Sequence, residues 1–270
     1  MAVLLGWSKG ILRLDQDVSR VDCPLQRADF LAVQNKQMAA LDNHAHQLWI
    51  GRDVYPADPG VEALYLLPWG CLILSGDTDC LTLHDSHTGQ RLLTAPAGVF
   101  PQDLCLIPGT ELLAVCGGAD GTVRLLTRRS LETVHIARVP GNAQRIDAAR
   151  GALHVLCLTE DDGLQCLLCR LSLRSLRYEP IASFPGIPGA IYAEFTGGLW
   201  VCASEVLYHL SPGHATPDRI IPGFGLIRHM DWRGSQLLIT DPVMEICALV
   251  ERCGTSHTIL EGPVQQAIFI

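Results

Sequence analysis

The sequence predicts an all-β fold, namely a seven-bladed β-propeller of four-stranded antiparallel blades. Three observations lead to this prediction. Glycines that precede apolar strands recur about every 40 residues, a period typical of propeller repeats. Each of these glycines is followed by the same order of strands and turns, and the two ends of the chain supply complementary parts of one further unit.

The recurrent glycine marks the start of each repeat. The clearest copy follows Gly98, where residues 101–107, 111–117, 122–126 and 133–139 are apolar runs separated by turn residues. The "GADG" segment between the second and third runs is typical of a hairpin turn, because Gly and Asp tolerate positive φ angles. Six such glycines are spaced 37 to 45 residues apart: Gly60, Gly98, Gly141, Gly186, Gly223 and Gly262.

This spacing predicts a single domain, 1-270, made of seven blades. The chain opens on second, third and fourth strands, and the closing "PVQQAIFI" is a first strand with nothing after it. We therefore expect residues 1-25 plus 263-270 to form one blade, which removes free sheet edges. Six blades remain the alternative if the weak copy that begins near Gln26 is misread. The other blades are expected at 26-60, 61-98, 99-141, 142-186, 187-223 and 224-262.

The composition indicates a large core and an acidic surface. Hydrophobic residues make up 48% of the 270 residues, and the net charge is -8 with only two lysines. Nucleic-acid binding needs clustered Lys and Arg, so we expect no nucleic-acid partner. The 11 cysteines show no disulfide spacing, as expected for free thiols in a reducing compartment. No signal-peptide pattern or membrane-spanning run is found, which predicts a cytoplasmic protein with no membrane partner.

Two blades carry a more specific pattern. Gly98 and Pro101 form a Gly-x-x-Pro start, and Asp85, Thr88 and Gly89 form an Asp-x-x-Thr-Gly turn. This repeat resembles that of YVTN-type propellers, which are related to the quinoprotein-like and surface-layer propellers. The Trp-Asp pair of a typical WD40 repeat is absent, so the similarity to the WD40 superfamily is a broad one. The resemblance implies a propeller fold. Because this group includes scaffolds, ligand-binding proteins and some lactonases and lyases, it leaves the function open.

The first strand of each blade in a propeller lines the central channel, and its polar residues suggest a ligand site at the channel mouth. Arg145 and Arg228 are suited to bidentate binding of a carboxylate or phosphate. The structural alternative is that Asp103 pairs with Arg145 across adjacent blades while the others bind channel water. The candidate residues are Asp29, Glu62, Asp103, Gln144, Arg145, Arg228, His229, Gln265 and Gln266.

The turns between second and third strands suggest a metal site. Asp42, His44 and His46 share one turn, and His-x-His on an extended segment points both rings to one face. Acidic turns of several blades offer oxygen ligands for Ca²⁺ or Mg²⁺, although Asp is also a common turn residue in its own right. Cys166 and Cys169 should point to opposite faces of a strand, which prevents them from sharing a metal. The acidic-turn residues are Asp42, Asp77, Asp79, Asp120, Glu160, Asp161, Asp162, Glu205 and Asp241.

The leading functional hypothesis is a non-catalytic binding module. Every turn is expected to be short, with no insertion that builds a lid or a deep pocket. We expect a protein partner or a small anionic ligand at the channel-mouth face, and no cofactor apart from a divalent cation in the metal hypothesis above. The alternative is a lactonase- or lyase-like enzyme that uses Arg145, Arg228, His229 and carboxylates, with a divalent cation. A purely structural module is the third hypothesis and predicts an exposed apolar patch.

Overall fold

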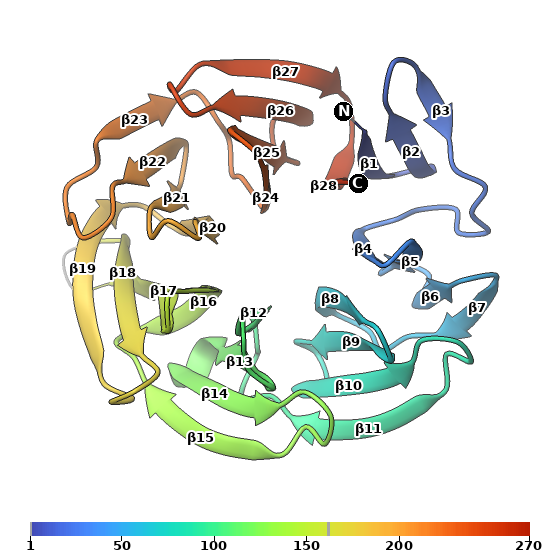
Figure 1. The fold of residues 1–270 in the computed structure, drawn as a ribbon, viewed down its shortest axis with the longest axis horizontal. Coiled ribbons are helices and arrows are strands. Elements are labelled where there is room, and N and C mark those ends of the chain that lie inside the picture. The colour runs from blue at the N-terminus through green and yellow to red at the C-terminus, as the bar shows by residue number, and fades with distance from the viewer. Residues whose placement is uncertain (1, 161–162) are drawn as a thin grey trace. The chain divides into compact units, whose positions relative to one another are not determined.

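The structure is all-β. The computed structural model describes residues 2–160 and 163–270 and places their strands in seven four-stranded antiparallel sheets (Figure 1). The one helical element among these residues is the short 3-10 turn η1 (Gly118–Asp120). Seven such sheets are the blades of a seven-bladed β-propeller, so the predicted fold class is confirmed. Within the described ranges, no helix has the length and hydropathy needed to span a membrane.

The chain divides into two compact units. The first comprises Met1–Ile73, Thr82–Leu93 and Gly225–Ile270, and the second comprises Leu74–Leu81 and Thr94–Phe224. One blade supplies residues to both units. Its strands are β8 (Val61–Leu67), β9 (Gly70–Ser75), β10 (Cys80–Asp85) and β11 (Arg91–Pro96).

The first unit contains three further blades. One consists of β4 (Phe30–Gln34), β5 (Gln37–Asp42), β6 (Gln47–Ile50) and β7 (Asp53–Pro56). Another consists of β24 (His229–Arg233), β25 (Gln236–Asp241), β26 (Ile246–Glu251) and β27 (Ser256–Glu261). The third joins β28 (Val264–Phe269) to β1 (Val3–Trp7), β2 (Gly10–Leu14) and β3 (Val18–Arg20).

The C-terminal strand completes the N-terminal blade, as predicted. Strand β28 pairs antiparallel with β1, and Leu5 lies opposite Ala267 in this pairing. Figure 1 shows β28 beside β1, with both chain ends in this blade. Because β28 satisfies the backbone groups on one side of β1, the N-terminal strand is not a free edge.

The second unit contains three complete blades in chain order. The first consists of β12 (Asp103–Leu106), β13 (Leu112–Gly117), β14 (Thr122–Thr127) and β15 (Thr133–Arg138). The next consists of β16 (Asn142–Ala149), β17 (Ala152–Thr159), β18 (Gln165–Ser172) and β19 (Tyr178–Pro185). The last consists of β20 (Pro188–Ala193), β21 (Leu199–Ala203), β22 (Val206–Leu210) and β23 (Arg219–Pro222).

The recurrent glycines of the sequence have a shared backbone role. All six adopt positive φ angles, a conformation that L side chains rarely adopt. At Gly186 a side chain would also collide with Ser204, because an added Cβ would overlap its hydroxyl. The repeat in the sequence therefore reflects a repeated turn between the fourth strand of one blade and the first strand of the next. The φ angles are 60° at Gly60, 119° at Gly98, 68° at Gly141, 100° at Gly186, 100° at Gly223 and 135° at Gly262.

The core of the second unit lies between the faces of neighbouring blades. Alternate residues of β18 enter different apolar clusters: Cys169 packs with Ala114 and Val155, and Cys166 packs with Val201 of the β20–β23 blade. The two thiols thus point to opposite faces, as expected from their spacing. Strands such as β17 are buried on both faces, which explains why the second strand of each repeat is almost uniformly apolar.

Candidate functional site

Asp103, a predicted ligand-binding residue, connects two blades. Its carboxylate accepts a hydrogen bond from the backbone N–H of Ile146 on the next blade at 3.0 Å and another from Leu104 on its own strand at 2.9 Å. Burial raises the pKa of Asp103 to about 6, although the nearby Arg145 guanidinium acts in the opposite direction. The carboxylate therefore holds the first strands of two blades together.

The same arrangement recurs in both units. Asp147 accepts a hydrogen bond from the Ala193 N–H at 2.7 Å, which joins β16 to β20. In the first unit, Asp231 accepts from the Phe269 N–H at 2.8 Å, which joins β24 to β28. Burial raises the pKa of Asp147 to about 7, despite the hydrogen bonds that it accepts. An acidic side chain on the first strand is thus a repeated interblade connection in this chain.

Two further predicted ligand residues also make interblade or turn contacts. The Gln266 side-chain oxygen accepts a hydrogen bond from the Leu31 N–H at 2.6 Å, which joins β28 to β4. Asp29 accepts from the Asn43 N–H at 2.8 Å, and the Asn43 side chain in turn bonds the backbone of Val61. These side chains therefore have structural partners within the protein, and Arg145 donates to backbone carbonyls of Gln102 and Gln144.

The predicted cationic residues lie in different units. In the second unit, Arg145 donates to the Gln144 carbonyl at 2.7 Å, and Arg228 and His229 belong to the first unit. Burial lowers the pKa of His229, whereas the charge of Asp231 raises it. Glu62 is a half-buried residue of β8. A shared ligand for the arginines remains a prediction from the sequence.

Two of the acidic-turn carboxylates, Asp42 and Asp241, accept hydrogen bonds from backbone N–H groups. Asp42 accepts hydrogen bonds from the N–H groups of His44 and Ala45 at 3.1 and 2.8 Å. The fully buried Asp241 accepts four backbone N–H groups, those of Gly225, Leu226, Val243 and Met244. Residues 2–160 and 163–270 contain no group of three His, Cys, Asp or Glu side chains placed to hold a metal, so Asp42, His44 and His46 are not such a group. The predicted Asp161 and Asp162 lie outside the described residues.

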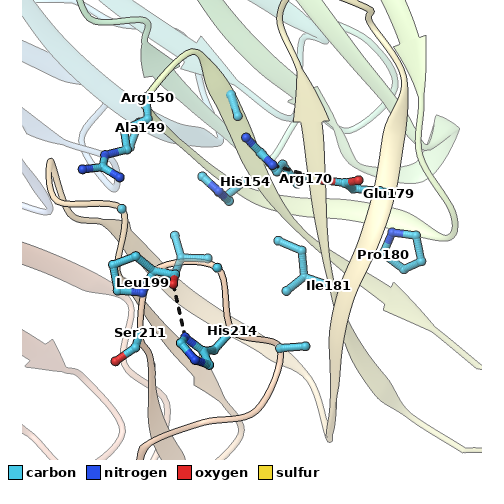
Figure 2. A pocket seen from close by; sticks show the side chains of 15 residues that line it. Ala149, Arg150, His154, Arg170, Glu179, Pro180, Ile181, Leu199, Ser211 and His214 are labelled. Carbon is cyan, nitrogen blue, oxygen red and sulfur yellow. Dashed lines mark hydrogen bonds and ion pairs between the residues drawn. The ribbon is translucent and has the colours of Figure 1, made fainter.

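A groove in the second unit is a candidate site. It has a volume of about 390 Å³ and lies where the β16–β19 blade meets the β20–β23 blade (Figure 2). We call it the interblade groove. Its walls come from β16 to β19, the turn before β21 and the loop after β22. The residues that line it are Ala149, Arg150, Ala152, His154, Arg170, Glu179, Pro180, Ile181, Gly197, Leu199, Ser211, Pro212, Gly213, His214 and Ala215.

Strand register places a row of ionisable side chains on the face that forms one wall. His154 lies opposite Asp147 on one side and opposite Arg170 on the other, and Arg170 lies opposite Glu179. Directly opposed residues share a face of the sheet. Arg170 and Glu179 form an ion pair of 3.2 Å, whereas Asp147 is engaged with the next blade. His154 thus lies between Asp147 and Arg170 in this row.

His154 lacks the partner that a buried histidine normally has. Its residue is only 8% exposed, and its Nδ1 atom is buried with no hydrogen-bond partner. Burial, with a further contribution from the Arg170 charge, lowers the pKa of His154 to about 4, so the ring is neutral at pH 7. His84, which is also buried, is different, because its ring nitrogens contact the Gly89 carbonyl at 3.1 Å and the Thr82 hydroxyl at 3.3 Å.

Arg150, a cation of the groove lining, contacts the backbone of an exposed aromatic residue. Arg150 Nε donates to the Phe195 carbonyl at 3.2 Å, and the Phe195 side chain is 92% exposed. The lining also includes part of the loop 211–218, in which the His214 ring bonds the Pro212 carbonyl at 3.2 Å. Figure 2 shows Arg150 and His214 on different sides of the groove, with His154 and Ile181 between them.

No sequence pattern predicted this groove. Short turns were expected in every blade, yet eight residues (211–218) separate β22 from β23, the longest third-to-fourth-strand connection among the blades described. The length of that loop was the one feature of the sequence that pointed to a groove beside it. His154 gave no signal, since one histidine in the run "ALHVLCL" has the pattern of a buried strand.

Comparisons with known proteins support the fold. No protein-family model matches the sequence, and no curated protein matches it. Among solved structures, a Lactobacillus plantarum protein is similar over 100% of both chains, with 13% identity and a TM-score of 0.77. A functionally unknown protein from Desulfotomaculum acetoxidans covers 97% of this chain and 98% of its own, with 10% identity and a TM-score of 0.76. Hydrazine synthase from Kuenenia stuttgartiensis covers 86% of this chain and 79% of its own, with 11% identity and a TM-score of 0.71.

These similarities concern the fold alone. At 10 to 13% identity, the neighbours share the architecture, and architecture does not determine activity. They bear out the resemblance to β-propeller repeat proteins and leave the site to be argued from its own residues.

Proposed function

We propose that this protein is a non-catalytic β-propeller binding module whose ligand or partner occupies the interblade groove. One observation carries the proposal: a groove of about 390 Å³ is lined by His154, a buried histidine whose Nδ1 atom has no hydrogen-bond partner. Buried polar atoms in folded proteins are nearly always paired, so an unpaired one beside a groove calls for an explanation, and a functional role is one.

The composition of the groove also fits binding. Ligand sites are concave and mainly apolar, with a few polar groups that fix orientation. Here Ala152, Ile181 and Leu199 supply apolar surface, and His154 and Arg150 supply the polar groups. The exposed Phe195, whose backbone carbonyl accepts a hydrogen bond from Arg150, adds the kind of aromatic surface that is enriched where proteins bind one another. This location replaces the channel-mouth face in our proposal.

Ligand-observed NMR with a mixed set of anionic, cationic and neutral fragments tests the proposal. We expect at least one fragment class to bind the wild-type chain and to lose this binding in the Ala215→Trp variant, in which the indole fills the groove from its exposed side. The matched control is Ala45→Trp, at an exposed turn residue of the first unit. If no fragment class binds, or if Ala215→Trp binds as well as wild type, the groove is not the site.

The same samples test the absence of catalysis. A binding module returns each bound fragment chemically unchanged after prolonged incubation with the protein. Turnover of a lactone or a related ester that is lost in Arg228→Gln would instead favour the lactonase-like alternative. That outcome would overturn the non-catalytic assignment.

A further inference from the structure

The charges of the interblade groove favour a singly charged anion. Its lining contains two arginines, Arg150 and Arg170, and one carboxylate, Glu179, which gives these three groups a net charge of +1. Glu179 already pairs with Arg170 at 3.2 Å, so the uncompensated positive charge belongs to Arg150. Complementary charge selects among ligands, and a monoanion balances this site whereas a dianion exceeds it.

His154 provides a neutral hydrogen-bonding group in the lining of the groove. Its ring is uncharged at pH 7 because burial and the Arg170 charge lower its pKa to about 4. A neutral imidazole has one N–H donor and one acceptor nitrogen. Asp147, the acidic neighbour on the adjacent strand, accepts hydrogen bonds from Ala193 and Ala148. His154 is therefore able to donate to a ligand oxygen.

The remaining surface of the groove is apolar. Ile181 and Leu199 line the cavity from β19 and β21 (Figure 2), and Pro180 and Pro212 also belong to its lining. A ligand consisting of a charged head alone would leave this surface in contact with water. A ligand with an apolar body buries it, which is the main favourable contribution to binding at such sites.

We propose that the interblade groove binds a compact apolar monocarboxylate. Its carboxylate lies between Arg150 and His154, and its apolar body packs against Ile181 and Leu199. This inference rests on the proposed function and specifies its ligand class. A free organic acid and the C-terminal residue of a peptide present the same chemistry, and the experiment separates the two.

Calorimetric titration of the full chain at pH 7 is the first test. The probes are benzoate and hexanoate as free acids, N-acetyl-alanyl-leucine as a peptide C-terminus, and benzamide and hexanamide as neutral counterparts. We expect the carboxylates to bind at least tenfold more tightly than their amides, because only they balance Arg150. Tighter binding of the dipeptide identifies a peptide C-terminus, and tighter binding of hexanoate identifies a free acid. Equal binding of acids and amides, or tighter binding of the dianion phenylphosphonate at pH 8.5, overturns the proposal.

Histidine variants separate a ligand-binding role from a structural one. Replacement of His154 by Leu removes a buried polar atom that has no partner, so we expect the melting temperature to be unchanged or higher while benzoate affinity falls at least tenfold. The matched control is His84→Leu, which breaks hydrogen bonds to Gly89 and Thr82 and should lower the melting temperature without changing benzoate affinity. Unchanged benzoate binding in His154→Leu contradicts the inference.

The inference and the proposed function fail in different ways. If neutral or cationic fragments bind and are displaced in Ala215→Trp while carboxylates do not bind, the groove is a binding site and its assignment to carboxylates is wrong. If no fragment binds at all, both fail. If benzoate binds and is lost in Arg228→Gln but not in Arg150→Gln, the site lies at the residues that the sequence suggested, and both statements about the groove are wrong.

Discussion

Removal of the Asp231 carboxylate should loosen the blade that contains both chain ends. Asp231 accepts hydrogen bonds from Phe269 N–H at 2.8 Å and from Trp232 N–H at 2.9 Å. The first of these bonds holds β28, the strand that completes the N-terminal blade. In Asp231→Ala both N–H groups lose their acceptor, whereas Asp231→Asn retains one acceptor oxygen and one of the two bonds.

The expected magnitude follows from these two bonds. A hydrogen bond to a charged acceptor contributes about 1.5–3 kcal/mol, and water replaces part of it here because Asp231 is only half-buried. We therefore expect Asp231→Ala to lower the free energy of unfolding by about 2 kcal/mol and Asp231→Asn by about 1 kcal/mol. For a chain of this length the unfolding entropy is about 0.6 kcal/mol/K, so the melting temperature should fall by about 3–4 °C and about 2 °C, respectively.

Thermal unfolding followed by circular dichroism measures these shifts, and hydrogen exchange locates them. The Phe269 amide should lose protection in both variants. Asp77→Ala, at an exposed turn residue, is the control and should match wild type. An Asp231→Ala protein with unchanged melting temperature and an equally protected Phe269 amide would refute the interblade role of these aspartates.

Three further predictions concern the second unit. Burial raises the pKa of Asp147 from 3.8 to about 7 in the fold, so the folded state binds an extra proton between these pH values and the free energy of unfolding should decline as pH rises from 4 to 7. Urea titrations at several pH values should show a flatter decline for Asp147→Asn. A wild-type decline equal to that of the variant would contradict this prediction. Gly186→Ala should lower the free energy of unfolding by about 2–4 kcal/mol, because φ is 100° and the new Cβ would collide with Ser204. A melting temperature within 1–2 °C of wild type would show that the turn adapts to the side chain. Trp200→Phe should lower the free energy of unfolding, measured by chemical denaturation, by about 1–3 kcal/mol, because the buried Glu194 loses the hydrogen bond from the indole N–H at 3.0 Å. An unchanged free energy of unfolding would show that this hydrogen bond does not stabilise the fold.

The fold was accessible from the sequence because its repeat is recorded in backbone chemistry. Gly98, Gly141 and Gly186 stand where φ is positive, and few other residues tolerate that conformation. The C-terminal run 263–270 was recognisable as a missing first strand because it is an apolar strand with no partner in its own repeat. The positions of these glycines and the number of strands between them were therefore enough to predict seven blades.

The roles of the polar residues were less accessible. The sequence placed Asp103 on a first strand, but its bond to the Ile146 N–H depends on the register between two blades, which is a tertiary property. His154 differs from His84 only in what its neighbours offer to the ring, and no local pattern encodes this difference. The loop 211–218 was visible as a longer connection, but its contribution to a groove depends on the packing of the adjacent blade.

The most direct test of the interblade groove is NMR of the chain with ¹⁵N-labelled histidines, recorded with and without benzoate. We predict that the His154 ring resonances shift on benzoate addition, with Nδ1 or Nε2 reporting a new hydrogen bond, while those of His84 do not move. Unshifted His154 resonances at saturating benzoate, or shifts confined to His229 of the first unit, would contradict the account.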